Sequence, residues 1–183
     1  MEREKQKLTE KILLHLADCI DFGFDYRVKK GLGISGKILR GFVKIKEKDF
    51  RDAITDLKKS KFIEKKMNYD GSVAISLTDR GKLRALNIQF KKLNNKKEHW
   101  DRRWRMVAFD IPEEFKKGRN ALRYRLRLAG FYELQESLFL YPYDCEKEIK
   151  TFIELFKLKK YVRFALLEFI DNQDDIKRIF GLD

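Results

Sequence analysis

Basic side chains are concentrated between residues 46 and 66, where apolar residues recur at helical spacing. Four apolar residues fall on one face of the predicted helix, namely Phe50, Ala53, Ile54 and Leu57. Cations on the exposed sides of a helix and on a following β-hairpin are suited to contact a nucleic-acid backbone. The residues predicted to make such contacts are Lys46, Lys48, Arg51, Thr55, Lys58, Lys59, Lys65 and Lys66.

Arg51 is the candidate for reading a base edge, because a planar guanidinium can donate two parallel hydrogen bonds to guanine. The lysines are better suited to phosphate groups. Three carboxylates on the same helix would repel phosphate unless they pair with neighbouring cations or face away: Asp49, Asp52 and Asp56. A helix that binds a protein instead of DNA therefore stays open as an alternative.

A second candidate site is Asp110, which ends a predicted strand two residues before Pro112. A carboxylate exposed at a sheet edge can bind Mg²⁺, and a symmetric dimer would bring two copies of Asp110 together. Alternatively, Asp110 caps the helix that follows Pro112, through its side-chain oxygen and the helix dipole. We expect no cofactor apart from this magnesium ion.

The remaining motifs do not indicate a cofactor, disulfide or hydrolase site. Gly31, Gly33 and Gly36 match G-x-G-x-x-G by letter, but no strand precedes them and no βαβ unit surrounds them, so they are interpreted as turn residues. Cys19 and Cys145 lie far apart and are predicted to be buried apolar residues. The sequence contains no Ser/His/Asp, Cys/His or HExxH arrangement, which removes support for hydrolases.

The first half of the chain has the element order of a winged helix-turn-helix. Helices are predicted over residues 4–20 and 37–42, and a third helix carries the cations described above. A β-hairpin follows, and its turn at residues 68–71 contains Asp-Gly, which supplies the positive φ of a tight turn. Thr78 is expected to cap a further helix.

The second half has the order strand, helix, strand, strand, helix, strand, which is that of a ferredoxin-like domain. These elements are predicted over residues 102–112, 113–129, 131–135, 136–142, 144–158 and 161–170. Phe115 is expected to face the core, and Gly130 to end the first helix. The predicted fold class is α+β, with a winged helix-turn-helix in residues 1–93, a linker in 94–99 and a ferredoxin-like βαββαβ dimerisation domain in 100–183.

The formal charge of +13 is unevenly distributed. Residues 1–98 hold 25 Lys and Arg against 14 Asp and Glu, whereas residues 99–183 hold 17 against 15. The first half is therefore the part expected to meet a polyanion such as double-stranded DNA. In the second half, Arg119, Arg123 and Arg127 share a helix face, where they extend that surface or pair with acidic residues.

The sequence has no apolar run of about 18 residues, and its N-terminus is polar and of mixed charge. We therefore expect a cytoplasmic protein that makes no membrane contact. Small domains of this size gain stability from association, so a homodimer is expected.

The segment WDRRWRMVAFDIP, followed by EEFKKGRNALRYRLRLAGFYELQESLFLYP, resembles the central domain of the phenylacetic-acid degradation repressor family, the PaaX type. That domain is itself similar to the small ferredoxin-like CRISPR-associated protein of spacer acquisition. Members of the repressor family carry a winged helix ahead of this domain, so the resemblance extends over nearly the whole chain.

The resemblance implies a dimeric transcriptional regulator, most often a repressor, that binds operator DNA. The best-known members respond to an acyl-coenzyme A effector, but typical members continue into a C-terminal region that this sequence lacks, so the effector is left unknown. In the CRISPR-associated relatives the aspartate that ends the first strand binds the catalytic metal, and Asp110 matches its place. A magnesium-dependent endonuclease or spacer-integration accessory is therefore the alternative function.

Overall fold

The computed structural model describes residues 2–20, 26–28, 46–67, 69, 73–95 and 99–182. The chain forms two compact units, Met1–Ile88 and Gln89–Asp183. The division falls inside one helix, α4 (Asp79–Leu93), whose last turn belongs to the second unit. The segment predicted as a linker, residues 94–99, follows the end of this helix, and residues 96–98 lie outside the described residues.

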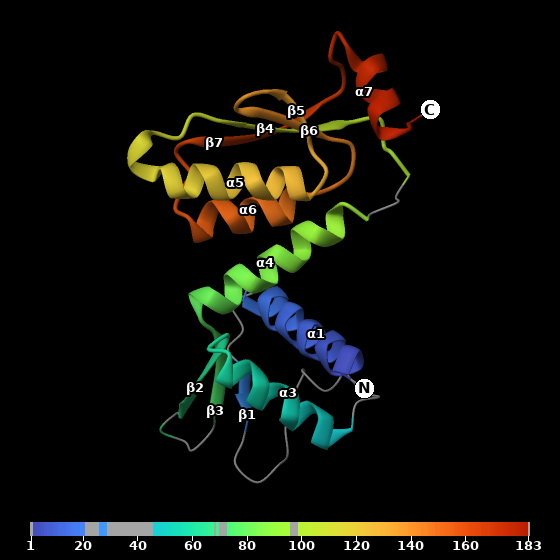
Figure 1. Cartoon of the computed structure of the whole chain (residues 1–183). Helices are drawn as coiled ribbons and strands as arrows, with labels where there is room; N and C mark the ends of the chain where they lie inside the picture. Colours follow the sequence, from blue (N-terminus) through green and yellow to red (C-terminus); the bar gives the residue numbers. More distant parts are fainter. Residues whose placement is uncertain are drawn as a thin grey trace. The chain divides into compact units, whose positions relative to one another are not determined.

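The first unit combines helices with a three-stranded sheet (Figure 1). Its elements besides the start of α4 are α1 (Glu2–Ile20), β1 (Tyr26–Val28), α3 (Glu47–Lys59), β2 (Ile63–Met67) and β3 (Val73–Leu77). The strands are antiparallel in the order β1-β3-β2. The predicted first and third helices and the hairpin are confirmed, whereas β1 was not predicted. The predicted helix over 37–42 and the three glycines of the G-x-G-x-x-G match lie outside the described residues.

The core of the first unit is built from one face of each helix and the inner face of the hairpin. Its buried members include Ile12, Leu13, Leu16, Phe50, Ala53, Ile54, Leu57, Ile63, Ile75 and Leu77. The apolar stripe predicted for α3 is thus the face that packs inward, and this packing stabilises the helix. The polar sides of α3 are left for solvent or a partner.

Helix α3 ends in a tight capping motif. The backbone N–H of Lys61 donates to the Lys58 carbonyl at 3.0 Å, and that of Phe62 donates to the Leu57 carbonyl at 2.9 Å. This is the hydrogen-bond pattern of a Schellman motif, which normally places glycine in the left-handed region. Here Lys61 adopts it, with φ of 57°.

The start of α4 is fastened to this helix end. The Thr78 hydroxyl donates to the Lys61 carbonyl at 2.7 Å and accepts from the Gly81 backbone N–H at 3.1 Å, which confirms Thr78 as the helix cap. The Thr78 backbone N–H donates to the Phe62 carbonyl at 3.0 Å. A Cβ atom at Gly81 would lie 1.9 Å from that same carbonyl oxygen, so only glycine allows this approach.

The second unit contains a four-stranded antiparallel sheet in the order β5-β6-β4-β7. Its elements are β4 (Trp104–Phe109), a 3-10 turn η1 (Glu113–Phe115), α5 (Lys116–Leu128), β5 (Tyr132–Gln135), β6 (Leu138–Tyr141), α6 (Glu146–Leu155), β7 (Val162–Leu167) and α7 (Gln173–Phe180). With β4 as the first of four strands, this is the ferredoxin-like order 2-3-1-4. The predicted βαββαβ domain is therefore confirmed.

The two faces of this sheet are covered differently. Helices α5 and α6 lie on one face, and α7 lies on the other side of the sheet (Figure 1). Trp104, Leu140 and Ile176 form a buried cluster beneath α7. Further along the α7 side, Met106, Leu138 and Ala165 are only half-buried, so this face of the sheet is incompletely covered.

The predicted position of Phe115 is wrong. Its side chain is exposed, and its ring packs against Tyr161 with centroids 5.4 Å apart. The helical spacing used to place it fails because η1 is a 3-10 turn ahead of α5, so Phe115 is out of phase with the buried Leu122 and Leu126.

We expect Gly81→Ala to lower the free energy of unfolding of the first unit by about 1–3 kcal/mol, because the new methyl group would collide with the Phe62 carbonyl. Urea titration followed by circular dichroism measures this change. Gly118→Ala is the matched control, since its Cβ would meet only side chains, those of Leu158 at 3.2 Å and Phe156 at 3.7 Å. Equal stability of the Gly81 variant and wild type would contradict the proposed close contact.

Candidate functional site

The exposed surface of α3 has a basic flank and an acidic flank. Arg51 and Lys58 are seven residues apart and therefore lie on the same side of the helix. Asp49 and Asp56 have the same spacing but start two residues earlier, which places them on nearly the opposite side. Two of the three carboxylates that weighed against phosphate binding, Asp49 and Asp56, therefore face away from Arg51 and Lys58.

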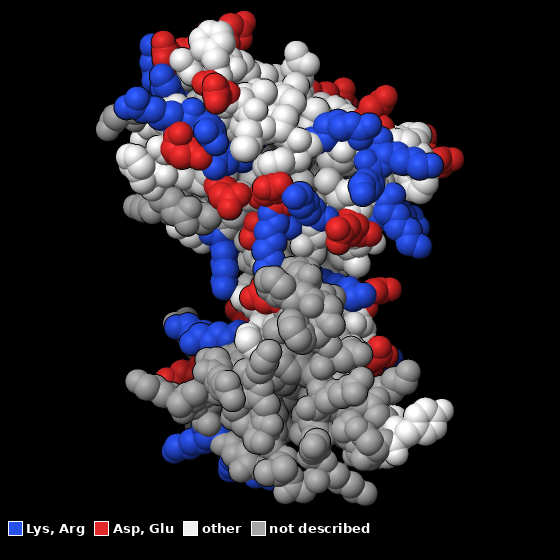
Figure 2. Space-filling view, turned by 180° about the vertical axis from the view of Figure 1, so that it is seen from behind, with Lys and Arg blue, Asp and Glu red and all other residues white. Residues whose placement is uncertain are grey.

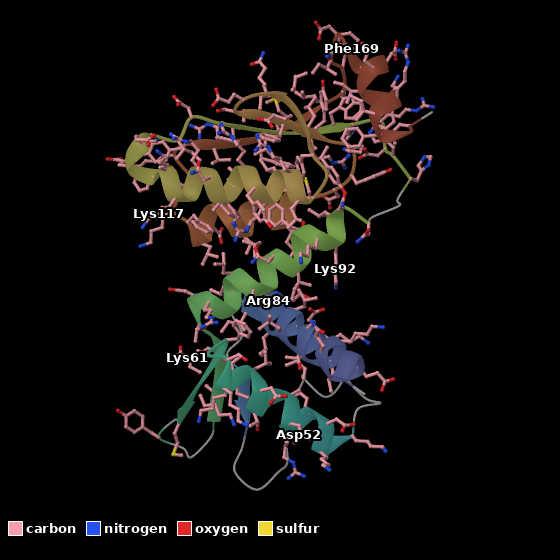
Figure 3. The ribbon with its side chains drawn as sticks, viewed as in Figure 1. Asp52, Lys61, Arg84, Lys92, Lys117 and Phe169 are labelled. Carbon is pink, nitrogen blue, oxygen red and sulfur yellow. The ribbon has the colours of Figure 1, made fainter. Side chains whose placement is uncertain are left out.

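Between these flanks, the outermost stripe of α3 carries Lys48, Asp52, Thr55 and Lys59. Asp52 projects from α3 in Figure 3. The Thr55 hydroxyl donates to the Arg51 carbonyl at 2.8 Å, so its hydrogen is already used within the helix. Of the predicted contacts, Thr55 is therefore the one least available as a donor to DNA.

The other predicted residues are placed as follows. Lys46, Lys48, Arg51, Lys58, Lys59 and Lys65 are all exposed. Lys66 belongs to β2, but its side chain lies outside the described residues. Within the described part of the chain, no ion pair joins Lys48, Lys58, Lys59 or Lys65 to a carboxylate.

Two features of the hairpin were missed from the sequence. Lys61 is exposed at the end of α3, where the left-handed backbone turns the chain into β2. Met67 and Tyr69, at the hairpin tip, are also exposed. Neither feature was predicted, because the sequence analysis considered only the strands and the turn of this segment and not the exposure of its side chains.

The arginines of the second unit pair within the domain. Arg119 donates to Glu113 at 2.6 Å, Arg123 to the Glu136 backbone carbonyl at 2.8 Å, and Arg127 to Glu133 through two nitrogens. Figure 2 shows blue and red side chains interleaved over this unit. Of the two roles predicted for this arginine row, the structure favours internal pairing.

Arg105 is a buried cation held by a carboxylate. Its guanidinium donates to both oxygens of Asp101, at 2.6 and 2.8 Å, and to the Pro142 carbonyl at 2.8 Å. These hydrogen bonds lower the pKa of the Asp101 carboxyl and raise the pKa of Arg105. The hydrogen bond to Pro142 connects β4 to the loop after β6.

Arg125 is buried without a carboxylate among the described residues. Its guanidinium lies 5.4 Å from the ring centroid of Phe152 and 5.7 Å from that of Phe156. One nitrogen donates to the Ala121 carbonyl at 2.9 Å. Burial lowers the pKa of this arginine, whose role is to fasten α5 to α6.

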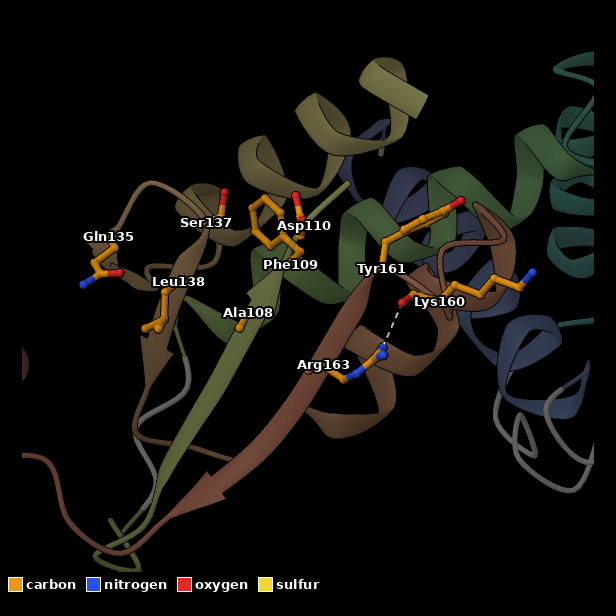
Figure 4. A pocket seen from close by; sticks show the side chains of 9 residues that line it. All are labelled: Ala108, Phe109, Asp110, Gln135, Ser137, Leu138, Lys160, Tyr161 and Arg163. Carbon is orange, nitrogen blue, oxygen red and sulfur yellow. Dashed lines mark hydrogen bonds between the residues drawn. The ribbon is translucent and has the colours of Figure 1, made fainter. Parts of the chain in front are cut away.

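Asp110 lies at the end of β4 with an exposed side chain, beside an open pocket of about 550 Å³ (Figure 4). The pocket is lined by Ala108, Phe109, Asp110, Gln135, Ser137, Leu138, Lys160, Tyr161 and Arg163. The predicted capping role of Asp110 is wrong, because the 3-10 turn begins after Pro112 and has no side-chain cap. The extended backbone at Pro112, with ψ of 163°, separates Asp110 from the helix.

The pocket beside Asp110 combines oxygen atoms with cationic side chains. Among the described residues, no group of three or more His, Cys, Asp or Glu side chains is close enough to hold a metal. Ser137 and Gln135 offer neutral oxygens, whereas Lys160 and Arg163 bring positive charge to the same pocket. Hard cations such as Mg²⁺ require carboxylate oxygens and are opposed by nearby cations.

The strand order and the helices on one face define the second unit as a ferredoxin-like domain. Residues 97–178 match the family model described as the PaaX protein central Cas2-like domain. This match confirms that the second unit resembles the central domain of the PaaX-type family, as noted in the sequence. No curated protein matches the chain. None of the helices in the described ranges has the length and apolar character that a membrane span needs.

We expect Asp101→Asn to lower the free energy of unfolding by about 1–3 kcal/mol at neutral pH, because Arg105 would stay buried without its charged acceptor. The pKa of Asp101 is depressed in the folded state, so its contribution is present above the unfolded pKa and is lost as the pH falls below about 4. Urea unfolding at neutral and acid pH measures this.

The control for this prediction is Glu168→Gln, which neutralises an exposed carboxylate after β7. The stability difference between wild type and Asp101→Asn should shrink at acid pH, whereas that for Glu168→Gln should stay near zero. A difference for Asp101→Asn that is independent of pH would contradict the role assigned to the ion pair.

Proposed function

We propose that this protein is a DNA-binding transcriptional regulator, a repressor that acts as a homodimer on operator DNA. The first unit would be a winged helix that contacts the duplex, and the ferredoxin-like unit would join two copies. The match of residues 97–178 to the central domain of PaaX proteins supports the regulatory role.

The observation that carries the proposal is the arrangement of α3. Its apolar side is buried, while Lys48, Lys58 and Lys59 are exposed without a carboxylate partner in the described part of the chain. A recognition helix needs an outward basic surface on a rigid base, because each phosphate contact releases a bound counterion. The acidic flank of α3 would face away from the DNA backbone that Lys58 contacts.

The order of the described elements supports a winged helix. Helix α3 is followed directly by the antiparallel hairpin β2–β3, with Lys65 exposed on β2. In such a domain the helix enters the major groove and the hairpin reaches the flanking backbone. Lys65 would then bind phosphate, while Arg51 would read a base edge.

The incompletely covered face of the second sheet supports the homodimer. Met106, Leu138 and Ala165 form a half-buried apolar area beside α7. Phe169, in the segment before α7 (Figure 3), is also exposed, as is Ile179 on α7. A second copy packed on this face would bury apolar area on both protomers and place two DNA-binding units on one duplex.

In vitro selection from a random duplex pool tests the proposal. We expect an inverted-repeat site whose half-site spacing reflects the dimer. Arg51→Ala should reduce discrimination between the selected and random duplexes by about 1–3 kcal/mol, because a base contact is lost. Lys65→Ala should weaken binding to both duplexes alike and lower the salt dependence of the dissociation constant by about one counterion.

Lys117→Ala is the matched control, since Lys117 is an exposed lysine on α5 (Figure 3) and has no partner within the described residues. It should leave both affinities and the salt dependence unchanged. If Lys117→Ala and Lys65→Ala have equal effects, the binding is a general consequence of positive charge. If wild type shows no salt-sensitive affinity, the first unit is a protein-binding module instead.

The alternative function, a magnesium-dependent endonuclease or spacer-integration accessory, depends on Asp110. Its exposed carboxylate, which has no side-chain partner within the described residues, favours this alternative. The absence of further ligands among those residues means that the other copy would have to supply them.

We expect Asp110→Ala to leave duplex affinity unchanged, since Asp110 lies in the unit that we assign to dimerisation. Wild type and variant should leave labelled RNA and DNA uncut in the presence of Mg²⁺. The measurement is gel electrophoresis after incubation, with EDTA-treated protein as the control. Metal-dependent cleavage by wild type that disappears in Asp110→Ala would establish the alternative.

A further inference from the structure

The tip of the β2–β3 hairpin carries two large apolar side chains that are not part of the core. Met67 exposes 72% of its surface, and Tyr69 is fully exposed. Among the large apolar side chains of the described residues, Tyr69 is the most exposed. Single exposed apolar residues are common on protein surfaces, so their meaning here depends on what surrounds them.

The pairing of the hairpin explains why these side chains leave the core. Ile63 lies opposite Leu77, and both are buried. Side chains of β2 alternate between faces, so Ile63 and Met67 lie on the same face of the strand. Met67 lies opposite Val73, beyond the last buried pair, and Tyr69 follows in the turn. The hairpin therefore carries apolar side chains past the edge of the core.

Among the described residues that lead to this tip, exposed lysines outnumber acids, and Asp70, which follows Tyr69 in the sequence, lies outside the described residues. Lys61 and Lys65 are exposed at the base of the hairpin. The neighbouring acid, Glu64, accepts a hydrogen bond from the Ser76 hydroxyl at 3.0 Å. A polyanion complements an apolar tip with lysines at its base better than a neutral or basic protein surface does.

We propose that Met67 and Tyr69 form an apolar wedge that enters the minor groove of duplex DNA and loosens the stacking of a base step. The proposal rests on the proposed function, since α3 in the major groove would bring the hairpin to the adjacent minor groove. Apolar side chains inserted between base pairs are a known way to bend DNA, and an aromatic ring can stack on a base. Lys61 and Lys65 would contact the phosphates on either side.

The wedge predicts a signature that differs from that of the lysines. Tyr69→Ala should weaken binding to a duplex at least about fivefold, because stacking on one base is lost. The salt dependence of the dissociation constant should stay unchanged, because Tyr69 contacts no phosphate. Tyr69→Phe keeps the ring and should bind like wild type. Met67→Ala should weaken binding in the same way as Tyr69→Ala.

The experiment uses the full chain and a random-sequence duplex of about 30 base pairs, three helical turns, with 2-aminopurine placed at successive positions. Fluorescence anisotropy gives the affinity, and 2-aminopurine emission reports unstacking. Wild type should raise this emission at one or more positions, and Tyr69→Ala should abolish the rise. Netropsin, which occupies the minor groove, should compete with wild type more strongly than with Tyr69→Ala.

Tyr124→Ala is the matched control, because Tyr124 is an exposed tyrosine on α5 in the other unit. It should change neither affinity nor emission. If Tyr69→Ala binds like wild type while Lys58→Ala and Lys65→Ala lose affinity, the wedge is overturned and the proposed function stands. If wild type shows no salt-sensitive binding to duplex DNA, the proposed function fails and the wedge fails with it.

Discussion

The proposed DNA-binding surface depends on the contact between the end of α3 and the start of α4. The Phe62 carbonyl accepts the Thr78 N–H at 3.0 Å and lies against Gly81, where a side chain would collide with it. The Thr78 hydroxyl bonds the neighbouring Lys61 carbonyl at 2.7 Å. After the hairpin the chain therefore returns to the end of α3. This contact fixes the positions of the cations on α3 relative to those on β2.

This fixed relation matters because a duplex presents its grooves and phosphates at fixed spacings. Cations on a loose hairpin would lose conformational entropy on binding, whereas those on a hairpin closed by Thr78 are already positioned. The same closure is what would carry Met67 and Tyr69 to a defined place beside α3. An exposed apolar tip is useful for recognition only if the backbone beneath it is rigid.

The arginines of the second unit and the lysines of α3 and β2 differ in their partners. In the second unit, Arg119, Arg123 and Arg127 each contact a glutamate of the same domain, and Arg105 is buried against Asp101. In the first unit, the described lysines of α3 and β2 have no such partners. The charge count of the sequence predicted this division, because the second half holds nearly equal numbers of acids and bases.

Local patterns predicted most of the elements, but contacts between distant residues decided the details. Apolar spacing was sufficient for α1, α3 and the ferredoxin-like order. Glycine predicted the end of α5 at Gly130, yet α3 and α6 end in the same motif with Lys61 and Lys157 at positive φ. A lysine in the sequence does not predict a left-handed backbone conformation, because here the packing of the following strand or loop imposes it.

At Asp110, the position in the fold and the surrounding side chains indicate different functions. The ferredoxin-like order places this carboxylate at the end of the first strand, where a metal-dependent enzyme would need it. The same pocket, however, includes Lys160 and Arg163, and the Arg163 guanidinium donates to the Lys160 carbonyl at 3.0 Å (Figure 4). Cations that line a pocket oppose the binding of a metal ion there. The place of Asp110 in the fold is therefore that of a metal ligand, whereas the described residues around it do not supply the further carboxylates that a magnesium ion prefers.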